Sequence, residues 1–257
     1  MILAIDIGNT NIVIGCIDRE KAYFVERLST VRTKTELEYA VDIKTLLELY
    51  HIKRQELDGG IIASVVPQIT TVMKEAAEKI IKEEVLVVGP GVKSGLNILM
   101  DNPATLGSDL VVGAVAAIEE YPAPLIVVDM GTATTVCMVD EKKRYIGGMI
   151  MPGVLTALDS LTVRASQLSG IALEAPKRVI GKNTIECMKS GVIYGNAACI
   201  DGVIDRMEEE LGQEATVIAT GGLAKKIIPY CKHEIILDDE LLLKGMRAIY
   251  YKNRVKK

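Results

Sequence analysis

One long-range duplication limits the possible folds of this chain more than any other feature. Residues 2–18 read ILAIDIGNTNIVIGCID, and residues 125–140 read LIVVDMGTATTVCMVD. Each segment contains an apolar run, an Asp-x-Gly step with a short polar cluster, a second apolar run and a closing Asp. A polar, glycine-containing turn between two β-branched runs is typical of a β-hairpin. The duplication therefore predicts two related halves, each built on a hairpin.

The remainder of each half alternates between strand and helix patterns. We expect strands at 60–66, 84–88, 145–150 and 216–219, and helices at 36–51, 70–82, 108–120, 155–168 and 185–211, with a last helical region opening at Gly221-Gly222. This alternation indicates the α/β class. The proline-containing segment Tyr121–Pro124 lies between the halves. It predicts two domains, residues 1–121 and 122–257.

Composition excludes several classes of function. The chain has 30 Lys and Arg against 34 Asp and Glu, and the resulting net charge of −4 argues against nucleic-acid binding. It contains no apolar stretch of the roughly 18 residues that a membrane span needs. The five cysteines form no CxxC pair, which predicts a reducing, cytoplasmic location. The two histidines lie near no cysteine or carboxylate cluster, so zinc chemistry and a histidine-based triad have little support.

The two Asp-x-Gly turns suit phosphate and metal chemistry. Glycine lets the main chain approach an anion, while exposed amides and Thr or Asn side chains supply hydrogen-bond donors. The carboxylate can hold a cation that screens phosphate charge. A single turn of this kind is more simply a tight hairpin with a capping Asp. Its repetition after a second buried strand favours two turns that clamp a nucleoside triphosphate. Two other glycine-rich stretches, 89–95 and 181–184, lack the spacing of a dinucleotide fingerprint or a P-loop.

A third acidic position, Asp109, stands at the start of an apolar helical pattern. The simpler interpretation is a helix N-cap, worth about 0.5–2 kcal/mol of stability. The functional interpretation is a general base that accepts a hydroxyl proton during phosphoryl transfer. Spacing alone leaves both interpretations open.

At these positions the chain resembles the type III pantothenate kinases, members of the actin-like ATPase superfamily. The matching stretches follow the family's order over nearly the whole chain: 6–11 (DIGNTN), 64–67 (SVVP), 89–97 (GPGVKSGLN), 102–103 (NP), 107–109 (GxD), 129–135 (DMGTATT), 147–153, 181–184 (GKNT) and 219–222 (ATGG). The resemblance implies two duplicated actin-like ATPase (ribonuclease H-like) domains that face a nucleotide cleft.

The resemblance also implies an activity, namely phosphorylation of pantothenate by ATP to 4′-phosphopantothenate, the first step of coenzyme A biosynthesis. It implies a homodimer that acts on a small molecule and uses Mg²⁺ together with a monovalent cation, K⁺ or NH₄⁺. The general base would be Asp109, and the monovalent cation would be held by Asp129. The residues implied for ATP phosphates are Asp6, which also holds the magnesium, with Gly8, Asn9, Thr10, Asn11 and Thr132. Those implied for the acceptor pocket, besides Asp109, are Met100, Gly107, Ser108, Leu110 and Thr184.

The acceptor positions depart from the family's usual residues. Leu110 replaces the family's Arg directly after the base, and Met100 replaces its Tyr two residues before Asn-Pro. Because leucine cannot form the charge-assisted pair that arginine makes with a carboxylate, the first change could remove about 1.5–3 kcal/mol of interaction. The sequence thus predicts an intact nucleotide side beside a weakened acceptor side. Three hypotheses remain open: a pantothenate kinase, a kinase of another hydroxyl compound, and a non-catalytic nucleotide-binding regulator. In the first, the partner subunit could supply the missing cation.

Overall fold

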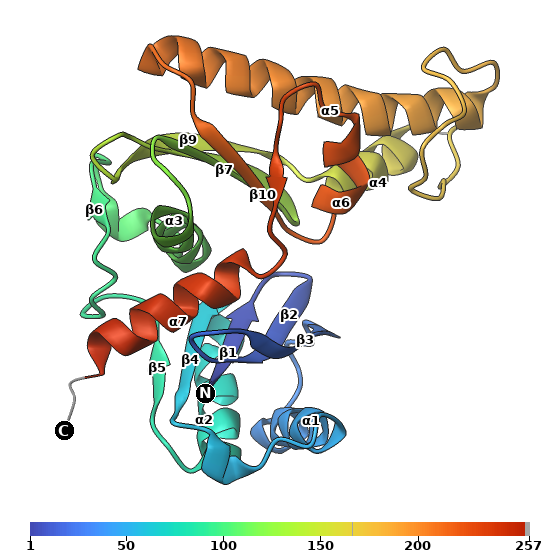
Figure 1. The fold of residues 1–257 in the computed structure, drawn as a ribbon. Helices are drawn as coiled ribbons and strands as arrows, with labels where there is room; N and C mark the ends of the chain where they lie inside the picture. The colour runs from blue at the N-terminus through green and yellow to red at the C-terminus, as the bar shows by residue number, and fades with distance from the viewer. Residues whose placement is uncertain (166, 255–257) are drawn as a thin grey trace. The chain divides into compact units, whose positions relative to one another are not determined.

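The computed structural model describes residues 1–165 and 167–254, and the chain divides into two compact units (Figure 1). Unit 1 holds Met1–Leu96, Asp101–Glu119 and the segment that begins at Glu240. Unit 2 holds Asn97–Met100 and Glu120–Asp239. Each unit contains its own β-sheet with helices packed against it.

Unit 1 is built on a five-stranded sheet of order β3-β2-β1-β4-β5. The strands are β1 (Ile2–Ile7), β2 (Asn11–Ile17), β3 (Ala22–Ser29), β4 (Gly60–Ser64) and β5 (Val85–Val87). The first three form an antiparallel meander, and β4 and β5 join β1 as parallel strands. A three-residue 3-10 helix, η1 (Arg54–Glu56), precedes β4.

Both faces of this sheet are buried, because alternate side chains of β1 enter different apolar clusters. Leu3 and Ile5 pack with the helices α1 (Glu36–Leu49) and α2 (Pro67–Ile81). Ile2 and Ala4 pack with residues of α3 (Ser108–Glu120) and α7 (Leu241–Asn253). β1 and β4 are therefore central strands whose ends are held firmly in place.

The C-terminal helix corrects one predicted domain boundary. α7 lies on the sheet of unit 1, where Met246 and Ile249 share a cluster with β1 and β4. A Cβ atom on Gly245 would overlap the carbonyl oxygen of Val112, so α7 and α3 pack closely there. The predicted domain of residues 122–257 is therefore wrong at its C-terminal end. An amphipathic helix shows that it must cover an apolar face, but its pattern does not say which sheet provides that face.

Unit 2 is built on a six-stranded sheet of order β11-β10-β7-β8-β9-β6. The strands are β6 (Asn97–Ile98), β7 (Leu125–Met130), β8 (Ala133–Val139), β9 (Arg144–Pro152), β10 (Thr216–Thr220) and β11 (Ile236–Leu237). The short strand β6 pairs with β9, which is why Asn97–Met100 belongs to unit 2 despite its place in the chain. The 3-10 helix η2 (Pro103–Thr105) follows within the part of the chain that returns to unit 1.

The helices of unit 2 are α4 (Val154–Arg164), α5 (Thr184–Leu211) and α6 (Ala224–Ile227), with the 3-10 helix η3 (Ile228–Tyr230). The long α5 runs along the sheet in Figure 1, and its buried residues share one apolar cluster with β7, β8, α4 and α6. The helix begins where the Asn183 side chain accepts a hydrogen bond from the Glu186 amide at 2.9 Å. It ends at Gly212, whose φ of 77° is the left-handed conformation that glycine favours at this position.

The two sheets confirm the predicted duplication. The order β3-β2-β1-β4-β5 of unit 1 corresponds strand for strand, and direction for direction, to β9-β8-β7-β10-β11 of unit 2. The predicted helices and strands are present with shifts of a few residues at their ends, and α3 agrees at both ends. The strands β3, β6 and β11 were not predicted. Within the described ranges, no helix has the length and apolar character needed to cross a membrane.

Candidate functional site

The first Asp-x-Gly turn connects β1 to β2 at one edge of the sheet of unit 1. Asp6 is the next-to-last residue of β1 and lies opposite Val13. The amide of Gly8 donates to the carbonyl of Asn11 at 3.0 Å and closes the turn, whose polar side chains are exposed. A Cβ on Gly8 would lie 3.0 Å from that same carbonyl oxygen, so a larger residue would be crowded. The predicted hairpin is confirmed, and its Asp, Asn and Thr side chains stand together at the strand end.

The start of the next loop holds this turn from outside. The Thr30 amide donates to the Thr10 carbonyl at 2.9 Å, and the Thr30 hydroxyl donates to the Gly8 carbonyl at 2.7 Å. One guanidinium nitrogen of Arg32 lies 3.3 Å from Asn9 Oδ1. Sequence reasoning missed these contacts, because no local pattern shows that residues twenty positions apart meet across β2 and β3.

The end of β4 places Asp109 on the same side of the sheet as the end of β1, where the first turn lies. β4 runs parallel to β1 with Ser64 opposite Ile7, so the two strands end side by side. The Ser108 hydroxyl accepts from the Ser64 amide and donates to the Ser64 carbonyl, both at 2.9 Å. The turn that follows Asp6 and the start of α3 therefore lie next to two adjacent strand ends.

Asp109 lies inside the first turn of α3, which begins at Ser108, and not at the N-cap position. The N-cap interpretation is therefore wrong in position. Asp109 Oδ1 accepts a hydrogen bond from the Leu110 amide at 2.8 Å, and a carboxylate in the first turn of a helix is stabilising. Burial nevertheless raises the pKa of its carboxyl group, against the opposing effect of the amide hydrogen bonds. A desolvated carboxylate binds a proton more readily than an exposed one does, which suits a general base.

Gly107 allows the Asp109 side chain to take this position. A Cβ on Gly107 would collide with Asp109 Oδ1. The glycine predicted for the acceptor pocket therefore has a local role, since it leaves space for the carboxylate. Leu110 is half-buried beside the carboxylate, and its main chain makes the hydrogen bond described above.

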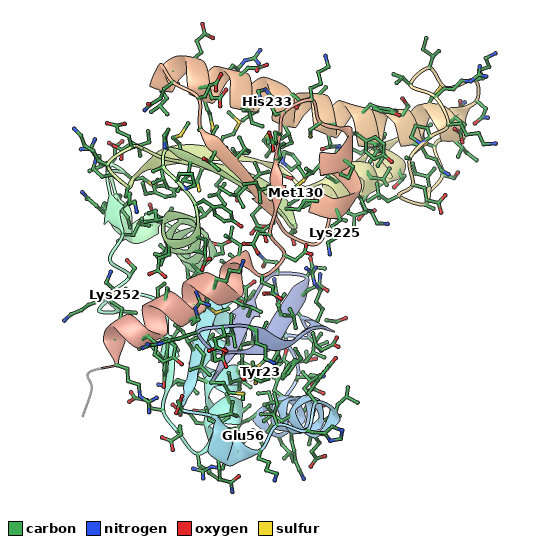
Figure 2. The ribbon with its side chains drawn as sticks, in the orientation of Figure 1. Tyr23, Glu56, Met130, Lys225, His233 and Lys252 are labelled. Atoms are coloured by element: carbon green, nitrogen blue, oxygen red, sulfur yellow. The ribbon has the colours of Figure 1, made fainter. Side chains whose placement is uncertain are left out.

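The second Asp-x-Gly turn connects β7 to β8 in unit 2. Asp129 lies between Thr135 of β8 and Thr220 of β10. The Gly131 amide donates to the Ala133 carbonyl at 3.0 Å, so this turn is one residue shorter than the first, in which Gly8 bonds Asn11. The neighbouring Met130 is buried in the unit's apolar cluster and is labelled in Figure 2.

Two glycines from distant parts of the chain pack against this second turn. Gly221 follows β10 with a φ of +94°, and a Cβ there would lie 2.5 Å from Asp129 Oδ1. Gly153 donates its amide to the Thr132 carbonyl at 3.1 Å, and a Cβ there would lie 2.7 Å from the Thr132 carbonyl carbon. The Thr156 hydroxyl donates to the same carbonyl at 2.7 Å. The start of α4 therefore fixes the main chain of the turn and leaves the Thr132 side chain exposed.

The remaining predicted acceptor residues lie on other elements of unit 2. Met100 follows β6, and Thr184 is the first residue of α5. Unit 1 thus groups Asp6, Gly8, Asn9, Thr10 and Asn11 with Gly107, Ser108, Asp109 and Leu110, while unit 2 groups Asp129 with Thr132.

Each Asp-x-Gly turn has one carboxylate at its strand end, and such a carboxylate could hold a cation together with phosphate. In the part of the chain that the structure describes, no group of three or more His, Cys, Asp or Glu side chains could hold a metal ion. Mg²⁺ is commonly held by one or two carboxylates together with substrate phosphates and water, in contrast to zinc. Asp6 at a strand end, beside a turn lined by amides and hydroxyls, provides such a partial site.

Comparison with known proteins shows the family of this chain. The model of the family described as Type III pantothenate kinase matches residues 2–206. An Exiguobacterium protein named Type III pantothenate kinase is 46% identical over 254 residues, which cover 99% of this chain and 100% of that protein.

Solved structures resemble the chain in fold. A protein from Campylobacter jejuni described as a Baf family transcriptional activator has a TM-score of 0.61 at 20% identity, with 98% of each chain covered. The activator of the 2-hydroxyisocaproyl-CoA dehydratase from Clostridium difficile, solved with bound ADPNP, has a TM-score of 0.57 at 13% identity, with 100% of this chain and 98% of that chain covered. These likenesses confirm the predicted α/β fold of the actin-like ATPase type.

Proposed function

Because the chain belongs to the type III pantothenate kinase family, we propose that it transfers the γ-phosphate of ATP to the hydroxyl group of pantothenate. The product is 4′-phosphopantothenate, and the reaction is the first step of coenzyme A biosynthesis. The observation that carries this proposal is the placement of the Asp6 turn and Asp109 at two adjacent strand ends of unit 1. A turn that binds phosphate and a partly buried carboxylate are the two groups that such a transfer needs from the protein.

On the nucleotide side, the turn from Gly8 to Asn11 would bind the ATP phosphates. Its exposed side chains and main-chain amides are hydrogen-bond donors, and Thr30 holds the turn in one conformation. The Asp6 carboxylate would hold Mg²⁺ together with phosphate oxygens, and the ion when bound would neutralise part of their charge. In unit 2, the exposed Thr132 side chain beside Asp129 is likewise suited to bind a phosphate oxygen.

On the acceptor side, Asp109 would take the proton of the attacking hydroxyl group. The hydroxyl oxygen forms a bond with the γ-phosphorus as the bond from that phosphorus to the bridging oxygen breaks, and ADP leaves. The ionised Asp109 carboxylate is the proton acceptor, and burial raises its pKa toward the range in which proton transfer is efficient. Gly107 and Leu110, which flank this carboxylate in unit 1, would lie beside the acceptor. Met100 and Thr184 of unit 2 stay predictions of the family resemblance.

The direct test is ADP release with and without pantothenate, in the presence of Mg²⁺. Pantothenate should stimulate ADP release, and Asp109→Asn should abolish this stimulation while the variant still binds ATP. Glu119→Gln is the matched control, because it removes one exposed carboxylate from the other end of the same helix. The control should retain the parent's activity. Equal loss of ATP binding and transfer in Asp109→Asn would assign Asp109 to structure, and absence of stimulation in the parent protein would exclude pantothenate as acceptor.

Leu110 favours a second candidate, the same chemistry on a hydroxyl compound without a carboxylate. The residue after the base offers an apolar side chain where the family usually has a cation. A screen of hydroxyl compounds at fixed ATP concentration separates the two acceptors. A protein that binds ATP but shows no turnover with any acceptor would instead be a nucleotide-binding regulator.

The monovalent cation and the homodimer belong to the same proposal. Asp129 would hold K⁺ or NH₄⁺, so activity should depend on either ion and lose that dependence in Asp129→Asn.

Unit 2 exposes large apolar side chains on α4 and on the segment before α5, with Val163 84% and Ile180 81% exposed. These side chains support contact with a second copy of the chain, as does the family. Light scattering would measure the oligomeric state. The expected location of the enzyme is the cytoplasm.

A further inference from the structure

On the side that pairs with β5, β4 extends beyond the last residue of β5. Main-chain groups of a strand face its two neighbours alternately. Gly60 and Ile62 face β5, since the Ile62 carbonyl accepts from the Val88 amide at 2.8 Å. Val65 faces β1, because its amide donates to the Ile7 carbonyl at 3.0 Å. The amide and carbonyl of Ser64 therefore face the β5 side, two residues beyond the last residue of β4 that pairs with β5.

The hydroxyl group of Ser108 occupies this position. It accepts from the Ser64 amide and donates to the Ser64 carbonyl, each at 2.9 Å. It thus makes the two hydrogen bonds that a neighbouring strand would otherwise make with Ser64. A hydroxyl group has only one hydrogen to donate, and here it is given to a carbonyl of the sheet. The Ser108 hydroxyl therefore has no hydrogen left for a bound acceptor.

The end of β4 to which Ser108 bonds is itself held by further hydroxyl groups. Ser64 Oγ lies 2.8 Å from Thr70 Oγ1 and accepts from the Val66 amide at 3.1 Å. Thr70 Oγ1 also lies 3.0 Å from the Val66 carbonyl, which connects the first turn of α2 to the strand end. Ser108 is thus attached to a rigid point, and Asp109 is the next residue.

We propose that Ser108 is a positioning residue, whose hydroxyl group fixes the start of α3 on the end of β4 and so holds Asp109 in place for proton transfer. The proposal rests on the proposed function, since it takes Asp109 as the base. It goes beyond the expectation that Ser108 lies in the acceptor pocket, because it gives the hydroxyl group a role within the protein. A base displaced by about 1 Å can lose roughly 100-fold in rate, because proton transfer depends on close alignment.

The test compares Ser108→Ala, which removes both hydrogen bonds, with Ser108→Thr, which keeps a hydroxyl group. In Ser108→Ala we expect kcat to fall by about 10- to 100-fold, while KM for pantothenate stays within about twofold. The acid limb of the kcat-against-pH profile should also move, because a displaced Asp109 is more hydrated. Ser108→Thr should restore most of kcat and the parent pH profile.

Thr216→Val is the matched control for lost stability. It removes a 2.9 Å hydrogen bond from a hydroxyl group to the Pro122 carbonyl in unit 2, at the start of β10. It should lower Tm and leave kcat and the pH profile unchanged. If the added methyl group of Ser108→Thr does not fit, Ser108→Cys keeps the volume with a weaker donor and should show an intermediate kcat.

Three results would overturn the proposal: a raised KM for pantothenate at unchanged kcat, parental kinetics in Ser108→Ala, or equal loss in the alanine and threonine variants. Amide hydrogen exchange separates this proposal from the proposed function. Exchange at Ser64 should be faster in Ser108→Ala and slow again in Ser108→Thr, with or without any acceptor. If the parent protein fails to use pantothenate but exchange behaves in this way, the proposed function fails while the bond to Ser64 stands. Unchanged exchange at Ser64 would overturn the positioning proposal by itself.

Discussion

Replacing Leu110 by arginine tests whether the acceptor side is weakened by one missing cation. Leu110 lies in the first turn of α3, half-buried, directly after the proposed base. Its amide already bonds the Asp109 carboxylate at 2.8 Å, so the substitution changes the side chain without removing that contact. The substitution restores the cation that the family usually has directly after the proposed base.

The expected gain follows from two opposing effects. A charge-assisted hydrogen bond to the pantothenate carboxylate is worth about 1.5–3 kcal/mol. A cation near the positive N-terminal end of α3 costs about 0.3–1 kcal/mol. The net gain of about 0.5–2.7 kcal/mol corresponds to an increase of about 2- to 100-fold in kcat/KM, at 1.36 kcal/mol for each factor of ten. The new charge also favours the ionised form of Asp109, so the acid limb of the pH profile should move to lower pH.

The assay measures kcat/KM for two acceptors. One is pantothenate, and the other is the same compound with its carboxylate replaced by an alcohol group. Leu110→Arg should improve the use of pantothenate and leave that of the alcohol unchanged. Leu110→Met is the matched control, because it keeps an apolar side chain of similar size and should alter neither value. An unchanged ratio between the two acceptors would show that Leu110 is not the missing contact.

Three further substitutions test the proposed base and the residues that pack against the two Asp-x-Gly turns. Asp109→Asn should raise Tm near neutral pH as well as abolish transfer. Burial raises the pKa of the folded-state carboxyl, so the parent loses stability as pH rises through that pKa, and the difference in Tm should vanish below the ordinary carboxyl range of about 3.9. Thr30→Val removes the 2.7 Å bond to the Gly8 carbonyl and should raise KM for ATP severalfold with little change in KM for pantothenate; an equal rise in both would show general damage. Gly221→Ala should cost about 1–3 kcal/mol, since the new methyl group meets Asp129 and φ is +94°. Gly191→Ala, with open space around it, should not destabilise the protein, and equal thermal unfolding of the two variants would contradict the packing argument.

Local sequence patterns were sufficient for features that depend on neighbours along the chain. The Asp-x-Gly hairpins, the parallel strand β4 and both ends of α3 follow from apolar periodicity and turn chemistry, and the structure agrees. The duplication was visible because both copies kept the same order of apolar, acidic and glycine residues. Each of these signals is contained in a short continuous segment, and the two copies of the duplication can be compared directly in a single sequence.

Contacts across the sheets were not predictable in the same way. The hydroxyl groups of Thr30 and Ser108 bond main-chain carbonyls 22 and 44 residues away. Serine and threonine are common in loops, so their presence at these positions carries no information about their partners. The placement of α7 on unit 1 is a similar case, since its apolar residues would suit either sheet. In each case the partner is a main-chain group or an apolar face, which has no distinctive residue type to mark it.

The two duplicated sheets differ at the position where the proposed base is attached. The Val88 amide bonds the Ile62 carbonyl at 2.8 Å in unit 1, and the Asp238 amide bonds the Ala219 carbonyl at 2.9 Å in unit 2. Ser64 and Gly221 each follow two residues later and are therefore equivalent. Ser64 stays extended and receives the Ser108 hydroxyl, whereas Gly221 turns with positive φ and packs against its own Asp-x-Gly turn. The same strand end thus anchors a helix that carries a carboxylate in one unit and closes over the turn in the other. Repetition thus gives the fold two Asp-x-Gly turns, and in unit 1 the strand end beside the turn is bonded to the helix that carries the proposed base, Asp109.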